Sequence, residues 1–157
     1  MIHQGISADL VADKWGISRE EMDQFSLESH QKAIQAQKEG RFDNEIMPLE
    51  VTLEDGTKTV VTKDEGPRED TSLDALAQLK PAFKEDGNIT AGNSSQISDG
   101  ANAILIMSRE KAEELGLKPR FRILTRVVVG SDPTLMLTGP IPATMKALKK
   151  ANLSIDD

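Results

Sequence analysis

The sequence predicts an α/β protein in which a mainly helical cap with a β-hairpin precedes buried strands that alternate with helices. Three patterns lead to this expectation: a long helix with a capping box at its start, an Asp-Gly turn between two β-prone segments, and two continuous apolar runs after residue 100. The organisation changes near residue 88. Two strands are too few for a closed α/β layer, so we expect the second part to be a piece of a larger domain.

Two consecutive helices are expected at the start of the cap. Ser7 is the predicted N-cap of a helix over residues 8–15. Ser18 and Glu21 then have the spacing of a capping box, and a helical pattern continues to Gly40. The predicted face of this second helix is formed by Met22, Phe25, Ser29, Ala33 and Ala36.

The rest of the cap is expected to be a hairpin, a loop and a short helix. Asp55-Gly56 separates two β-prone segments and predicts the hairpin turn. Gly66-Pro67 breaks regular structure, so residues 64–68 are predicted as a loop. Residues 71–79 have the pattern of a short helix whose capping box begins at Thr71.

Apolar segments dominate the second part of the chain. Residues 103–107 form a continuous apolar run that predicts a strand buried on both faces, and residues 123–129 predict a second core strand. Helices are expected beside them at residues 110–115 and 143–151, with Gly116 and Asn152 at their C-terminal ends.

Composition excludes several classes of function. The net charge is −7, and the first 100 residues hold 20 acidic and 10 basic side chains, which argues against general nucleic-acid binding. There is no apolar run long enough to span a membrane and no basic segment followed by an apolar stretch at the start, so we expect a cytoplasmic protein. Cysteine is absent, which excludes disulfides and a cysteine nucleophile within these residues. Clustered metal ligands, a Gly-x-Ser-x-Gly motif and a phosphate-binding loop motif are also missing.

Residue patterns alone indicate at most a ligand-binding cap and do not by themselves predict an enzyme. The small, polar segment 90–100 is the best candidate for a ligand loop, because small side chains let a ligand approach the backbone and Ser94 and Ser95 add hydroxyl groups. The alternative is a solvent-facing turn. Arg68 could hold an anionic or aromatic group, or form a surface salt bridge. On residue patterns alone, His3 and His30 are better explained as surface or packing residues.

Several motifs resemble the thiolases, the family of 3-ketoacyl-CoA thiolase and acetyl-CoA acetyltransferase, and they occur in family order along the whole chain. The matching stretches are His3-Gln4-Gly5-Ile6-Ser7-Ala8, Gly16-Ile17-Ser18-Arg19-Glu20-Glu21, Asp64-Glu65-Gly66-Pro67-Arg68, Leu79-Lys80-Pro81-Ala82-Phe83, Thr90-Ala91-Gly92-Asn93-Ser94-Ser95, Ser98-Asp99-Gly100-Ala101 and Gly139-Pro140-Ile141-Pro142-Ala143.

The resemblance covers only the middle of such an enzyme. It implies that residues 1–88 are most of the CoA-binding loop domain, that residues 89–118 end the N-terminal half, and that residues 119–157 begin the C-terminal half. The implied reaction is acyl transfer between CoA thioesters: a cysteine thiolate cleaves a 3-ketoacyl-CoA with CoA to acetyl-CoA and a shortened acyl-CoA, or the reverse reaction condenses two acetyl-CoA. The two cysteines, the Asn-Glu-Ala-Phe segment and the Gly-His-Pro histidine of the family are not in this sequence, so the chain alone is expected to be inactive.

The resemblance also assigns binding roles, with CoA as substrate and no other cofactor. His3 matches a histidine on the pantetheine arm, Arg68 an arginine at the adenine–phosphate end, and Met136 a residue near the acyl pocket. Gln4 stands where acetoacetyl-type members often carry a methionine, and Ala75 stands where some members carry a CoA-contacting serine. The residues that match the lining of the CoA channel are Phe83, Ala91, Ser94, Ser95 and Ile97.

Other interpretations remain open at this point. The chain could be a stand-alone CoA-binding or interaction module, or a truncated reading frame without a function of its own. The motifs favour a degradative 3-ketoacyl-CoA thiolase as the parent, and the family implies a homodimer or homotetramer. Uncovered apolar segments would predict self-association or loose packing.

Overall fold

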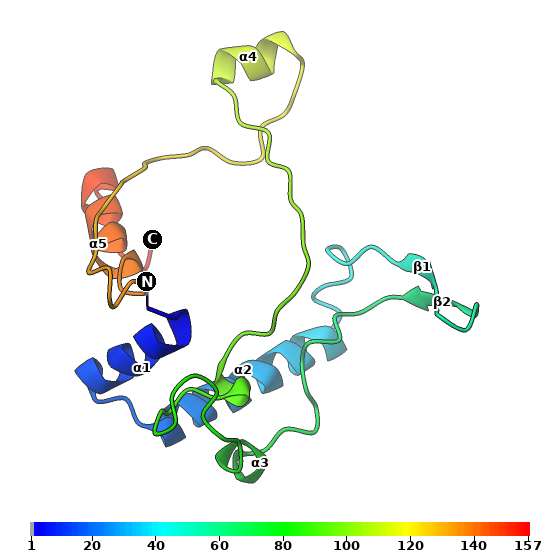
Figure 1. Cartoon of the computed structure of the whole chain (residues 1–157). Coiled ribbons are helices and arrows are strands. Elements are labelled where there is room, and N and C mark those ends of the chain that lie inside the picture. Colours follow the sequence, from blue (N-terminus) through cyan, green and yellow to red (C-terminus); the bar gives the residue numbers. More distant parts are fainter. Residues whose placement is uncertain (1) are drawn as a thin grey trace.

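Helices near the N-terminus form the packed part of the chain (Figure 1). The computed structural model describes residues 2–157. Helix α1 (Gln4–Trp15) is followed by the long helix α2 (Arg19–Lys38). Helix α3 (Leu73–Ala77) and the 3-10 helix η1 (Ala91–Asn93) both contact α2, although they come much later in the sequence.

Helix α1 starts earlier than predicted. Its N-cap is His3, whose Nδ1 accepts a hydrogen bond of 3.1 Å from the backbone N–H of Gly5. Ser7, the predicted cap, is fully buried inside the helix, where its hydroxyl donates to the backbone oxygen of Thr134 instead. The predicted end is confirmed: Gly16 takes the left-handed conformation, with φ +64°, that a residue without a Cβ adopts readily.

The capping box of helix α2 is confirmed, whereas its predicted face is buried only in part: Met22, Ala33 and Ala36 are half-buried, but Phe25 and Ser29 are exposed. The Ser18 hydroxyl accepts from the backbone N–H of Glu21, and the Glu21 carboxylate accepts from the backbone N–H of Ser18. Phe25 leaves 75% of its surface exposed, whereas Asp23 is buried. The buried residue of α2 is therefore a charged one.

The predicted hairpin is confirmed. Strands β1 (Leu49–Thr52) and β2 (Lys58–Val61) pair in antiparallel register, from Leu49 opposite Val61 to Thr52 opposite Lys58. Gly56 in the turn has φ +83°, a conformation that favours glycine. The hairpin projects beyond the C-terminal end of α2 (Figure 1).

Helix α3 is shorter than predicted. It occupies Leu73–Ala77 rather than residues 71–79, and its N-cap is Ser72 instead of Thr71, because the Ser72 hydroxyl accepts from the backbone N–H of Ala75. After α3, an isolated β-bridge between Pro81 and Thr90 closes the loop that leads to η1.

The predicted core strands are wrong as secondary structure. Residues 103–107 and 123–129 are extended but not assigned to a strand, and Ile104 is 78% exposed. A strand needs hydrogen bonds to a neighbouring strand, and neither segment has such a neighbour among residues 2–157. Figure 1 shows the chain after η1 as a wide loop that carries α4 (Arg109–Glu114) before it returns to α5 (Pro140–Ala151).

Helix α5 begins at Pro140, three residues before its predicted start, because the Gly-Pro-Ile-Pro segment enters the helix with proline in its first turn. The predicted ends of both late helices are confirmed. Gly116 follows α4 with φ +64°, and Asn152 caps α5 with φ +55°.

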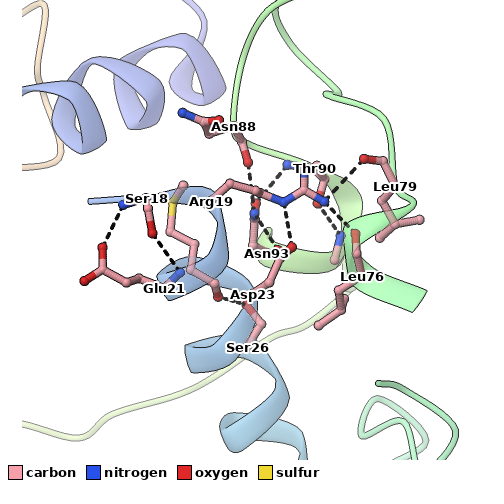
Figure 2. A network of polar contacts seen from close by, with 12 residues as sticks. Ser18, Arg19, Glu21, Asp23, Ser26, Leu76, Leu79, Asn88, Thr90 and Asn93 are labelled. Atoms are coloured by element: carbon pink, nitrogen blue, oxygen red, sulfur yellow. Dashed lines mark hydrogen bonds and ion pairs between the residues drawn. The ribbon is translucent and has the colours of Figure 1, made fainter. Parts of the chain in front are cut away.

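A buried ion pair at the start of helix α2 lies against the end of helix α3 (Figure 2). The Arg19 Nε donates to the Asp23 carboxylate over 2.7 Å, and both side chains are largely buried. The same guanidinium also donates to the backbone oxygen of Leu76, at the C-terminal end of α3, over 2.5 Å. Arg19 therefore fastens the end of α3 to the start of α2.

The Asn93 amide extends this network to η1 (Figure 2). Its Nδ2 donates to Asp23 over 3.1 Å and to the backbone oxygen of Asn88 over 3.0 Å, and its Oδ1 accepts from the backbone N–H of Thr90 over 2.8 Å. Asn88 in turn donates its backbone N–H to the buried Asp9 carboxylate of α1 over 2.7 Å. One polar network thus connects α1, α2, α3 and η1.

In the part of the chain that the structure describes, no helix combines the length and apolar character needed to cross a membrane.

Replacing the central amide of the network should destabilise the cap. Asn93→Ala leaves the buried Asp23 carboxylate and the Thr90 N–H without this partner, so we expect the free energy of unfolding to fall by about 2 kcal/mol. Urea unfolding followed by far-UV circular dichroism measures the change, with the exposed Asn44→Ala as control. Equal midpoints for the two variants would contradict a structural role for Asn93.

The exposed apolar segment 103–107 should drive self-association of the 157-residue chain. Ile106→Asp places a charge in the middle of this segment, so we expect the associated fraction in sedimentation velocity to decrease. Asn102→Asp adds the same charge next to the apolar run and serves as the control. Association that is equal in both variants would show that this segment is not the contact.

Candidate functional site

The residues singled out by the sequence lie in two groups on the cap. The first group surrounds the start of helix α1 and contains His3, Phe83 and Met136. The second group belongs to η1 and the loop after it, with Arg68 on a neighbouring loop: Ala91, Ser94, Ser95, Ile97 and Arg68.

In the first group, the aromatic rings of His3 and Phe83 lie against each other. Their centroids are 4.9 Å apart, with an angle of 30° between the ring planes. Phe83 also lies directly over Gly5, where an added Cβ would be 2.1 Å from the Phe83 Cγ. The absence of a side chain at Gly5 therefore makes room for the ring, and the capping bond of His3 fixes the other side of the pair.

Met136 reaches the same helix through a turn that Asp132 stabilises. The Asp132 carboxylate accepts the backbone N–H groups of Thr134 and Leu135, and these hydrogen bonds lower the pKa of Asp132 below its ordinary value. The backbone oxygen of Thr134 accepts from the Ser7 hydroxyl over 2.6 Å. Met136 is half-buried and follows Thr134, the residue that contacts α1, by two positions.

The second group follows the polar network described above. Thr90 caps η1, since its hydroxyl accepts from the backbone N–H of Gly92, and Thr90 itself is fully buried. This anchor leaves the residues after it on the surface: Ser94 is half-buried, and Ser95 is exposed. Ala91 and Ile97 are exposed as well, so the small and polar loop presents its side chains and backbone to solvent.

The Arg68 loop lies on helix α2, next to this second group. The Gln37 amide donates to the backbone oxygen of Asp64 over 2.8 Å, and the backbone N–H of Arg68 donates to Nδ1 of His30 over 3.2 Å. A Cβ added at Gly66 would lie 2.4 Å from Nε2 of Gln96, so the side chain of Gln96 packs against the backbone of the Arg68 loop.

The structure therefore brings Arg68 and Ser95 to one side of α2, although they are 27 positions apart in the sequence. Asn93 binds α2 at Asp23 and the Arg68 backbone binds it at His30. Seven residues of helix correspond to about 10 Å between these two attachment points.

This arrangement is suited to binding a ligand. It offers an exposed guanidinium, exposed hydroxyl groups, exposed backbone and an aromatic pair, which suit a ligand with phosphates and an amide-containing chain. No group of three histidine, cysteine or acidic side chains among residues 2–157 could hold a metal ion.

Sequence reasoning missed the residues that hold the loops in place. His30 was explained as a surface or packing residue, yet it accepts the backbone N–H of Arg68. Gln96 and Gly66 were not recognised as the contact between the two loops. Their signal was weak because each makes its contact with a segment at least 30 residues away.

Comparison with known proteins gives the family of the chain. A family model described as "Thiolase, N-terminal domain" matches residues 1–110. A 3-ketoacyl-CoA thiolase of Aliivibrio fischeri is 53% identical over 154 residues, which are 98% of this chain and 40% of that protein. An acetyl-CoA acetyltransferase of Chromobacterium violaceum is 50% identical over 155 residues, which are 99% of this chain and 40% of that protein. The chain thus spans about 40% of the length of these relatives.

Solved structures agree with these relatives. The acetyl-CoA acetyltransferase of Bacillus anthracis superposes with a TM-score of 0.86 at 42% identity, covering 99% of this chain and 39% of that one. Human mitochondrial 3-ketoacyl-CoA thiolase gives a TM-score of 0.85 at 42% identity, covering 96% of this chain and 38% of that one. The superposition with these structures therefore includes the wide loop after η1.

The contact between Gly5 and Phe83 can be tested with one methyl group. Gly5→Ala would place a Cβ inside the Phe83 ring, so we expect the ring to move away from His3. The measurement is the NMR chemical shift of the His3 ring protons, which should lose the contribution of the neighbouring aromatic ring. Gly100→Ala is the matched control, because a Cβ there meets no atom within 4 Å. Unchanged His3 shifts in Gly5→Ala would contradict the stacked arrangement.

Proposed function

The chain belongs to the thiolase family, and from that premise we propose that its 157 residues form the coenzyme A-binding section of an acyl-CoA C-acyltransferase. The observation that carries the proposal is the contact of the two loops at Gly66 and Gln96, which places Arg68 and Ser95 on the same side of α2. Residues 1–88 form the cap in this proposal, residues 89–118 end the first half of the parent enzyme, and residues 119–157 begin the second half.

The two groups of residues correspond to the two ends of CoA. Arg68 is proposed to bind the adenine–phosphate end, because a guanidinium both pairs with phosphate and stacks on a purine ring. Ser95 is proposed as a hydrogen-bond donor to the pantetheine arm, with Ala91, Ser94 and Ile97 along the same channel. His3 and Phe83 then contact the arm further along, and Met136 lies at the acyl end.

The bond-making residues are proposed to lie outside these 157 residues. In the parent reaction, a cysteine thiolate attacks the 3-keto carbon of a 3-ketoacyl-CoA, the bond between C2 and C3 breaks, and a protonated C2 leaves as acetyl-CoA. The acyl group then passes from the cysteine sulfur to the thiol of a second CoA. The sequence contains no cysteine, so the chain by itself is proposed to bind CoA without thiolysis.

The setting of the parent enzyme is part of the same proposal. We place it in the cytoplasm as a homodimer or homotetramer that acts on acyl-CoA in fatty acid degradation, without nucleic-acid or membrane partners. The 3-ketoacyl-CoA thiolases among the similar proteins support the choice of acyl-CoA as substrate.

Calorimetric titration of the chain with CoA tests the proposal. We expect the unaltered chain to bind CoA, and Arg68→Ala to weaken binding at least tenfold, because a charge-assisted contact with phosphate is lost. Arg120→Ala removes an exposed arginine elsewhere and should leave the affinity unchanged. Far-UV circular dichroism should be the same for all three proteins. If the unaltered chain does not bind CoA, the proposed function is wrong.

A further inference from the structure

We propose that His30 is a positioning residue for the nucleotide end of CoA, because its imidazole fixes the backbone from which Arg68 extends. This inference rests on the proposed function and deepens it: it names the helix residue that sets the geometry of the phosphate-binding arginine. His30 acts through Arg68 and has no contact with the ligand of its own in this proposal.

The contact is made with the backbone of Arg68 itself. The N–H of Arg68 donates to Nδ1 of His30 over 3.2 Å, across 38 positions of sequence. His30 is half-buried on α2, whereas Arg68 is exposed. The hydrogen bond therefore holds the Cα of Arg68 against a rigid helix and leaves its side chain on the surface.

Other contacts hold the two ends of the Arg68 loop, so His30 is the residue that fixes the backbone of Arg68 itself. Gln37 binds the backbone oxygen of Asp64, at the start of the loop. Lys38 and Glu69 form an ion pair of 3.5 Å after it, but both side chains are about 70% exposed, and such pairs contribute little. Arg68 lies between these two attached residues of the loop, and His30 bonds directly to Arg68.

Restriction of the loop favours ligand binding by lowering the entropy lost in the complex. The Asp64 carboxylate accepts from the N–H of Gly66 over 2.8 Å, and Pro67 fixes its own φ. Arg68 follows immediately, and its N–H is the first one after proline that can be bonded. Without the His30 acceptor, the chain after Pro67 is held to α2 only by the exposed Lys38–Glu69 ion pair.

An acceptor at the Nδ1 position is the chemical requirement. Neutral imidazole with its proton on Nε2 supplies it, and the Oδ1 of asparagine supplies an acceptor at a similar distance from the backbone. Leucine has a similar size and favours helix, but it has no acceptor. His30→Leu and His30→Asn therefore form a matched pair that separates the hydrogen bond from packing.

The test is an NMR titration of the chain and its variants with two separate probes, adenosine 3′,5′-bisphosphate and pantetheine. We expect His30→Leu to weaken binding of the bisphosphate about three- to tenfold, the effect of one hydrogen bond, and to leave pantetheine binding unchanged. His30→Asn should restore the affinity to within about twofold. Ser29→Leu, at the exposed neighbouring position, is the control for adding an apolar side chain to α2.

Amide hydrogen exchange without ligand gives an independent readout. His30→Leu should accelerate exchange of the Arg68 N–H, and His30→Asn and Ser29→Leu should not. Equal bisphosphate affinity in His30→Leu and the unaltered chain, or an equal loss for both probes, would overturn the positioning role alone. Absence of bisphosphate binding by the unaltered chain would instead overturn the proposal that the Arg68 loop binds the nucleotide end of CoA, and the positioning role with it.

Discussion

The buried ion pair between Arg19 and Asp23, completed by the amide of Asn93, is the interaction on which the rest of the cap depends (Figure 2). Buried apolar side chains are few among residues 2–157: they are Ala12, Leu76, Ile89 and Ala112. Burial of a charged pair is favourable only when its remaining donors and acceptors are satisfied. Asn93 donates to the second oxygen of Asp23, and the backbone oxygens of Leu76 and Leu79 accept from the Arg19 guanidinium. Helices α2, α3 and η1 are therefore held by a polar network instead of a large apolar core.

This network determines where a ligand can bind. It fixes the start of the loop that carries Ser94 and Ser95, and the same helix α2 holds the Arg68 loop through His30. Both loops therefore share one rigid support and meet at Gly66 and Gln96. The cap can therefore hold these two loops in a fixed arrangement, even though the chain after η1 forms a wide, open loop (Figure 1).

The sequence predicted the site only in part. The motifs named His3, Phe83, Arg68 and Ser95, and the structure places the first two in contact and brings the loops of the other two together. Their roles toward CoA stay predictions. His30 could not be identified in this way, because its partner is a backbone N–H and any residue at position 68 except proline would offer the same donor.

What the sequence by itself determined is part of the local structure, because most caps and turns depend on neighbouring residues, although the N-caps predicted at Ser7 and Thr71 were replaced by His3 and Ser72. The capping box at Ser18, the turn at Gly56 and the left-handed ends at Gly16, Gly116 and Asn152 are all predicted and confirmed. Only the tertiary structure decided that residues 103–107 and 123–129 form no strand and that Phe25 is exposed. An apolar run becomes a strand only beside another strand, and an apolar face becomes core only beside another surface, and those partners depend on distant parts of the chain.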